Sequence, residues 1–341
     1  MTNQKLISIG HIDQTKSRIK TIDFIKGILV LLMVIYHVLN YLQYGVTPHH
    51  YMAFLPCSFI MITGFLVTQI YLTKYDFKIV GLRLGIRSMK LLLLFTALNV
   101  VDRVMRSKNH NETALNIYAF FKNWFNVYVI GEADKVAFEV LIPISYTLFL
   151  AIFILKIQST KSYFICIFAA ATFVLCTLMD IYGYSIFNLY FLSSGIIGLA
   201  FGGVRIGIID QYARSWKFIS MLLMIYLGIF IFDIDNYISQ IIITFVSLII
   251  FYSIGVVTYS EQWWFKQVCI LGRYSLISYI VQILYLQVTK NIELLKVEHS
   301  LKETFLLMFI IAFFTWITVI VVDYGRLKNR AISWSYSILF T

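Results

Sequence analysis

Charged residues are scarce in this chain of 341 residues: they make up 13% of it, and only 17 are acidic. A soluble domain carries about 25% charged residues and is about half apolar, whereas this chain is 60% hydrophobic, with a mean hydropathy of +0.81. So much apolar surface excludes a soluble globular protein. With only three prolines and short polar stretches, a long disordered region is excluded as well.

Cysteine is also rare. The four cysteines, Cys57, Cys166, Cys176 and Cys269, lie in or beside apolar stretches and form no CxxC pair. Closely spaced cysteine pairs are the pattern expected of metal sites and redox motifs. We therefore expect small buried side chains at these positions, with neither a disulfide nor a bound metal.

Long apolar runs are abundant. Runs of about 20 residues have the length that an α-helix needs to cross a bilayer. The sequence therefore predicts an all-α polytopic membrane protein whose transmembrane domain spans 21–325, between cytoplasmic segments at 1–20 and 326–341. We expect a bundle of ten helices, at 22–42, 52–72, 84–102, 136–155, 162–180, 187–205, 217–233, 237–258, 268–289 and 304–323.

The net charge of +11 is divided among short clusters between the apolar runs. A nucleic-acid partner would need one basic patch, so none is predicted. With ten helices, 20 of the 28 Lys and Arg residues fall on the side that holds both termini. Positive charge favours the cytoplasmic side, so both termini are expected there. The high usage of Lys, Ile, Tyr and Phe is typical of an AT-rich bacterium, so the expected location is the bacterial cytoplasmic membrane, among its lipids.

The first helix carries ionisable residues in an apolar setting, where such residues are costly and indicate function. Lys26 and His37 are eleven residues apart, which places them on one helical face about 16 Å apart along the axis. Asp23 can brace Lys26 as an i,i+3 ion pair. The alternative is that Lys26 extends to the membrane surface and His37 is a packing residue.

The third helix opens with a basic stripe, Arg83, Arg87 and Lys90, at i, i+4 and i+7. Guanidinium groups bind phosphate oxygens bidentately, so this stripe suits a ligand with several phosphates. The alternative is ordinary positive charge that sets membrane orientation.

The ninth helix carries a polar stripe formed by Gly272, Ser275, Tyr279 and Gln282. Small and hydroxyl residues also hold membrane helices together, which explains Ser275 equally well. Gln282 is the residue that packing explains least.

Glu139 lies about one turn inside the outer surface on the predicted helix at 136–155, at a depth comparable to that of His37. A carboxylate at hydrogen-bonding distance would orient the imidazole and raise its basicity. We therefore expect a pairing of His37 with Glu139, with Asp102 and Asp134 as alternatives.

These residues together resemble the integral membrane acyltransferase superfamily, which includes the acyltransferase 3 family, the OpgC glucan-succinylation proteins and the heparan-alpha-glucosaminide N-acetyltransferase-like proteins. The first helix of that family reads Asp-x-x-Arg-Gly, with ten residues between the Arg and a His. This chain has that register in Asp23, Lys26, Gly27 and His37. The Ser-Gly element of the family's second helix is matched by Thr63 and Gly64.

Two further elements of the family follow in order. The Arg-x-x-Arg of its third helix is similar to 87–90, and its Leu-Gly-x-x-Ser-Leu-x-x-Tyr matches 271–279. The chain departs from the family at Lys26 and Lys90, which replace Arg, at Thr63, which replaces Ser, and at Gln282, which stands where many members have His. Lys keeps the charge but loses the planar fork, and Gln cannot transfer a proton.

The resemblance implies transfer of an acyl group, acetyl in the simplest case, from cytoplasmic acyl-CoA to a carbohydrate or lipid-linked carbohydrate at the outer face. Arg83, Arg87 and Lys90 would bind the phosphates of CoA, with Lys26 deeper along its path. His37 would act as general base, and Ser275, Tyr279 or Gln282 would stabilise the oxyanion. Asp23, Gly27, Thr63 and Gly64 would support the site; CoA is a substrate, and no permanent cofactor or metal is implied.

Two alternatives remain open at this point. His37 could carry the acyl group covalently before transfer. A secondary carrier or flippase that exports a polysaccharide or lipid-linked sugar without acyl chemistry would also have many helices with buried polar stripes.

Overall fold

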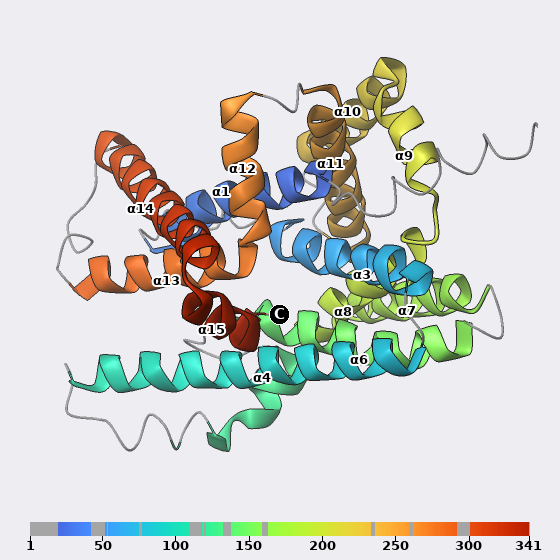
Figure 1. The fold of residues 1–341 in the computed structure, drawn as a ribbon. Coiled ribbons are helices and arrows are strands. Elements are labelled where there is room, and N and C mark those ends of the chain that lie inside the picture. The colour runs from blue at the N-terminus through green and yellow to red at the C-terminus, as the bar shows by residue number, and fades with distance from the viewer. Residues whose placement is uncertain are drawn as a thin grey trace, which may run out of the picture.

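The computed structural model describes residues 20–41, 52, 54–74, 77–108, 118, 121–131, 138–158, 163–232, 236–258, 262–291 and 301–340. Every regular element within these ranges is a helix (Figure 1). In chain order they are α1 (Lys20–Tyr41), α3 (Phe54–Lys74), α4 (Phe77–Lys108), the π-helix η1 (Asn126–Ile130), α6 (Leu141–Gln158), α7 (Phe164–Ile181), α8 (Phe187–Phe201), α9 (Ile206–Ala213), α10 (Trp216–Ile231), α11 (Tyr237–Val257), α12 (Trp263–Arg273), α13 (Ser275–Asn291), α14 (Leu301–Lys328) and α15 (Arg330–Phe340).

Six of these helices, α1, α3, α4, α7, α11 and α14, are long and apolar enough to cross a membrane. The bent pairs α8–α9 and α12–α13 raise the number of candidate spans to eight if each pair crosses as one. Large apolar side chains such as Leu175 on α7, Leu227 on α10 and Phe309 on α14 are exposed along the outside. Water-soluble proteins avoid apolar surfaces of this extent. The predicted all-α fold is confirmed for the described residues, and the six to eight candidate spans fit the predicted multi-pass membrane protein.

Most predicted spans coincide with a helix to within a few residues, and the largest differences concern bends. The single helix predicted at 268–289 is wrong, because α12 and α13 meet at Tyr274 with a bend of 84°. The helix predicted at 187–205 ends at Phe201, and α9 leaves at 100°. The helix predicted at 84–102 is the longer α4, and the predicted tail at 326–341 contains the end of α14 and the whole of α15. The predicted segment at 1–20 lies outside the described residues except for Lys20.

The bend at Tyr274 is held by polar contacts with the end of α14. The Tyr274 hydroxyl donates to the Asp323 carboxylate (2.7 Å) and accepts from the Arg326 guanidinium (3.0 Å). Arg273 forms an ion pair with Asp323 (3.7 Å), and the Arg326 guanidinium lies 3.7 Å from the centre of the Tyr336 ring on α15. These contacts explain why a continuous apolar run does not form one straight helix.

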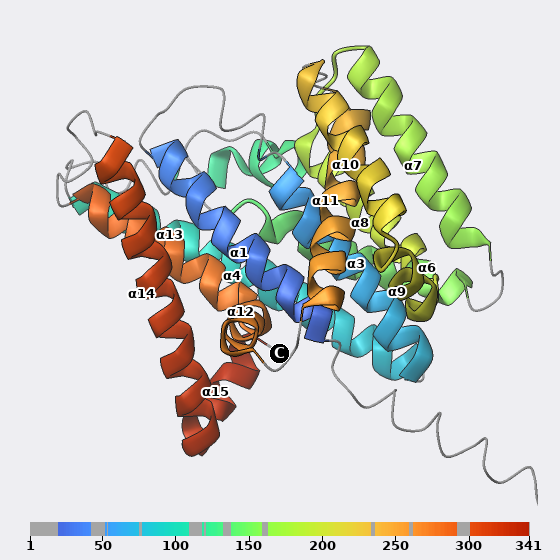
Figure 2. The same cartoon turned by 90° about the horizontal axis from the view of Figure 1, so that it is seen from above.

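α1 lies inside the bundle and packs against α3, α11, α12, α13 and α14 (Figure 2). Its contact with α12 is a close backbone approach. A methyl group on Gly27 would overlap the Val268 carbonyl oxygen, and one on Gly272 would overlap the Asp23 carbonyl oxygen. Helices in membranes approach most closely where small residues face each other, so these two glycines fix how α1 sits on α12.

Candidate functional site

The predicted ion pair on α1 is present. Lys26 Nζ lies 3.4 Å from the Asp23 carboxylate, with Asp23 buried and Lys26 partly exposed. The Asp23 backbone carbonyl faces Gly272, so the pair lies where α1 meets α12. Gly27 thus serves the α1–α12 contact. The structure positions Lys26 by an ion pair and by backbone packing together.

His37 lies near the other end of α1, beside two aromatic rings. Its ring centre is 5.4 Å from that of Tyr36 and 6.0 Å from that of Tyr279 on α13. The side chain is partly exposed, but Nε2 is buried and has no hydrogen-bond partner among the described residues. Buried polar atoms in folded proteins nearly always have a partner. An unpaired imidazole nitrogen inside a membrane helix is therefore a candidate for a ligand contact or a proton transfer.

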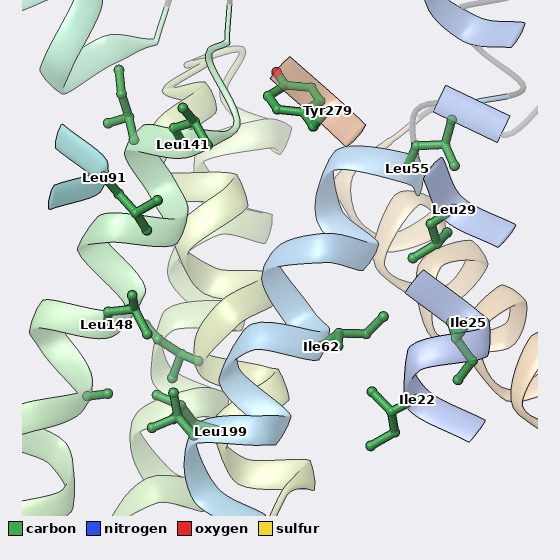
Figure 3. Close-up of a cluster of buried hydrophobic side chains, with 14 of the residues drawn as sticks. Ile22, Ile25, Leu29, Leu55, Ile62, Leu91, Leu141, Leu148, Leu199 and Tyr279 are labelled. Carbon is green, nitrogen blue, oxygen red and sulfur yellow. The ribbon is translucent and has the colours of Figure 1, made fainter. Parts of the chain in front are cut away.

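Tyr279 joins His37 to a strained segment of the chain. The Phe138 ring packs edge-on against Tyr279, with ring centres 5.8 Å apart. Phe138 is buried and has a φ of 64°, a left-handed conformation that costs about 1–3 kcal/mol and is concentrated at functional sites. Figure 3 shows the Tyr279 ring at the edge of the main apolar cluster, beside Leu141 and Leu55 in this view.

Glu139 lies in the turn before α6, outside the membrane-spanning helices, which corrects its predicted place inside a helix. That helix begins only at Leu141, three residues after Phe138, whose left-handed backbone is not helical. The carboxylate is close enough to the Tyr36 hydroxyl to interact electrostatically. Partial removal of water by neighbouring atoms raises the pKa of Glu139 to about 7, although the residue as a whole is exposed.

The structure thus brings Glu139 to the tyrosine next to His37, and no described hydrogen bond joins the two predicted partners directly. The alternative Asp102 is buried on α4, whose main packing partner is α6. The other alternative, Asp134, lies outside the described residues.

The predicted polar stripe on the ninth helix is divided by the bend. Gly272 belongs to α12, whereas Ser275, Tyr279 and Gln282 belong to α13. Ser275 is only partly buried. Gln282 is 0% exposed, and neither its Nε2 nor its Oε1 has a hydrogen-bond partner within the described ranges. Gln282 is thus the oxyanion candidate whose side-chain amide is both buried and open to a hydrogen bond from a ligand.

The basic stripe lies on a different part of the bundle. Arg83 and Arg87 are exposed on α4 and Lys90 is partly exposed, on a face shared with exposed apolar side chains such as Leu82 and Ile86. α4 packs chiefly on α6 and also contacts α15, whereas Lys26 belongs to the α1–α12 contact. The position of the stripe on an outer face fits contact with lipid headgroups as well as with a phosphate ligand.

The two residues that match the family's second helix have structural positions. The Thr63 hydroxyl donates to the Phe59 carbonyl of its own helix (2.8 Å). A methyl group on Gly64 would overlap the Gly195 carbonyl oxygen, so Gly64 permits close packing of α3 on α8.

Sequence reasoning missed the cluster of Arg273, Tyr274, Asp323 and Arg326, and it missed Thr315 on α14. Thr315 is 1% exposed, and its hydroxyl has no partner in the described part of the chain. Asp323, an acid near the end of a long apolar helix, was the one available signal for the cluster. A single threonine in such a helix carries no signal.

Comparison with known proteins adds no identification. No protein-family model matches the sequence, and no characterised protein matches it.

Proposed function

We propose that the protein is a membrane acyltransferase that moves an acyl group, acetyl in the simplest case, from cytoplasmic acyl-CoA to a carbohydrate or glycolipid acceptor at the outer face. His37 is the general base: its imidazole accepts the proton of the acceptor hydroxyl or amine as that group attacks the thioester. A base of this kind typically contributes 10²–10⁴-fold to the rate.

The observation that carries the proposal is the buried, unpaired His37 Nε2. A packing histidine in an apolar interior normally has both nitrogens satisfied or exposed. Lys26, eleven residues earlier on the same helix, supplies a positive charge about 16 Å away. This length suits the extended pantetheine arm of CoA between its phosphates and its thioester.

The proposed topology has ten spans, with both termini in the cytoplasm. The six long helices, the two bent pairs and the shorter apolar helices α6 and α10 supply that number. The start of α1 and the end of α15 lie toward the same end of the bundle (Figure 2). An even number of membrane spans requires this, because it leaves both termini on one side. The cytoplasmic end of the bundle would then hold Lys26 at the α1–α12 contact, with Arg83, Arg87 and Lys90 on the outer face of α4.

Binding of CoA tests the proposal first. We expect CoA to raise the unfolding temperature of the detergent-solubilised protein, and Arg87→Glu to reduce this effect. Lys302→Glu is a matched charge reversal on an exposed residue at the opposite end of α14 from Arg326, and it should leave the CoA effect unchanged. Absence of any CoA effect on the wild-type protein would contradict the donor assignment.

A covalent mechanism is the main variant of this proposal. If His37 takes the acyl group first, incubation with acetyl-CoA alone should produce a protein heavier by one acetyl group, and His37→Ala should not. Direct transfer predicts no such adduct. Mass spectrometry of the intact protein distinguishes the two routes.

Export of a polysaccharide or lipid-linked sugar is the second candidate, because two of the candidate spans are broken, by 100° and 84°. Broken helices line the substrate sites of many transporters. Stabilisation by an outer-surface polysaccharide without any effect of CoA would favour the exporter. Surface glycans that lose an acyl mass when the protein is removed would favour the enzyme.

A further inference from the structure

Helices α1, α13 and α14 share a seam that contains two apolar layers. In one layer Leu31 packs with Ile277 and Val319. In the other layer Leu286 and Ile311 pack with α1, through the two valines Val34 and Val38. Each layer contains residues of α1, α13 and α14. The three helices therefore pack together at both levels along α1.

Between these layers the seam contains two polar residues, Gln282 and Thr315. Helices α13 and α14 run antiparallel, because Ile277 shares an apolar cluster with Val319, whereas Leu286, later on α13, shares one with Ile311, earlier on α14. Gln282 is one turn before Leu286, and Thr315 is one turn after Ile311. Residues four apart lie on the same face of a helix. Gln282 and Thr315 therefore lie at the same height along the seam, on the faces of α13 and α14 that pack toward α1.

Thr315 is unusual among the threonines of this bundle. The Thr318 hydroxyl donates to the carbonyl four residues before it (2.8 Å), and so does the Thr289 hydroxyl (2.6 Å). Thr315 makes no such bond, although it is 1% exposed. The Gln282 amide and His37 Nε2 also have no hydrogen-bond partner among the described residues. The seam therefore contains three buried polar groups that make no hydrogen bond within the described part of the protein.

We infer that Gln282 and Thr315 bind the carbonyl oxygen of the acyl thioester, next to His37. The inference rests on the proposed function and adds Thr315 to its site. Gln282 lies three residues from Tyr279, on the same side of α13, and Tyr279 contacts His37. In the inferred arrangement an N–H of Gln282 and the O–H of Thr315 would both donate to one oxygen beside the base, as donors to an oxyanion must.

The acceptor oxygen or nitrogen forms a bond to the thioester carbon and gives its proton to His37 Nε2. The carbonyl electron pair moves to oxygen, where the Gln282 and Thr315 donors stabilise the negative charge. The oxyanion then collapses, the C–S bond breaks, and the CoA thiolate takes the proton from His37.

Isotope-edited infrared spectroscopy of [1-¹³C]acetyl-CoA bound to the solubilised protein tests the inference without an acceptor. Hydrogen bonds to the thioester carbonyl shift its stretch to lower wavenumber than in free acetyl-CoA. Thr315→Val and Gln282→Met should each move the band back toward the free value. Thr318→Val, one turn along α14, is the matched control and should leave the band where it is in the wild type.

Turnover gives a second readout, measured as thiol release from acetyl-CoA with glucosamine, N-acetylglucosamine or water as the acceptor probe. Each of the two variants should lower kcat about 100-fold, as loss of one oxyanion donor does, with little change in KM. Because Thr315→Val replaces an unpaired buried hydroxyl with a methyl group, its unfolding temperature should stay the same or rise. If the Thr315 hydroxyl had only a structural role, Thr315→Val would not lower kcat while the unfolding temperature stayed the same.

The outcomes separate the two proposals. If acetyl-CoA does not bind the wild-type protein, the proposed function fails. If it binds and its carbonyl band is the same in the wild type and both variants, the proposed function stands and the role of Gln282 and Thr315 is refuted.

Discussion

Replacement of Gly272 by alanine tests whether the close approach of α1 and α12 positions the site. The added methyl group would overlap the Asp23 carbonyl oxygen and crowd the Gly27 backbone nitrogen. Both are backbone atoms and cannot rotate away as a side chain would, so the two helices must separate. Overpacking of this kind costs about 1–3 kcal/mol, and we expect a value near the upper end.

A matched control comes from α10. Gly228 has no atom within 4 Å of an added methyl group, so Gly228→Ala should stabilise the protein by up to about 1 kcal/mol through helix propensity alone. The two Gly→Ala changes are therefore expected to have opposite signs. The expected ranking is Gly228→Ala above wild type, and Gly272→Ala well below it.

The protein supplies its own reporters for this measurement. Cys57, Cys176 and Cys269 are buried and form no disulfide, so a thiol-reactive dye labels them only as the protein unfolds. Cys166 is exposed and gives a constant background. If Gly272→Ala unfolds at the wild-type temperature, the α1–α12 contact is not as close as described, and the argument that it positions Lys26 fails.

Two further predictions follow from described contacts. Because partial desolvation raises the pKa of Glu139 to about 7 from its usual 4.5, the folded protein holds this proton more tightly than the unfolded chain. The contribution of Glu139 to stability is therefore complete below pH 4.5 and is lost as the pH rises through 7. Thermal unfolding between pH 5 and 8 should therefore show a loss of stability that Glu139→Gln reduces, and an identical pH profile in that variant would refute the raised pKa of this carboxyl. Tyr274→Phe removes the hydroxyl that bonds Asp323 and Arg326 and should cost about 1–3 kcal/mol; a dye-unfolding temperature equal to that of the wild type would show that these bonds do not hold the bend.

Local sequence patterns were sufficient for the parts of the fold that depend on neighbouring residues. Apolar runs predicted the helices, and helical spacing predicted the Asp23–Lys26 ion pair, which the structure confirms. The position of His37 about three turns from Lys26 follows from the same periodicity.

The features that sequence reasoning missed depend on residues far apart in the chain. The bend at Tyr274 is held by Asp323, 49 residues later. Glu139 was misplaced because Phe138 adopts a left-handed backbone that its residue type does not favour. Thr315 gained significance only from the register between α13 and α14.

The central claim is that His37 accepts a proton during acyl transfer. The most direct test measures acetyl-CoA turnover and CoA binding on the same preparations of wild type, His37→Ala and His37→Gln. The account predicts that both variants bind CoA with an affinity close to that of the wild type, while turnover falls by at least 100-fold. Turnover at the wild-type rate in either variant would contradict it.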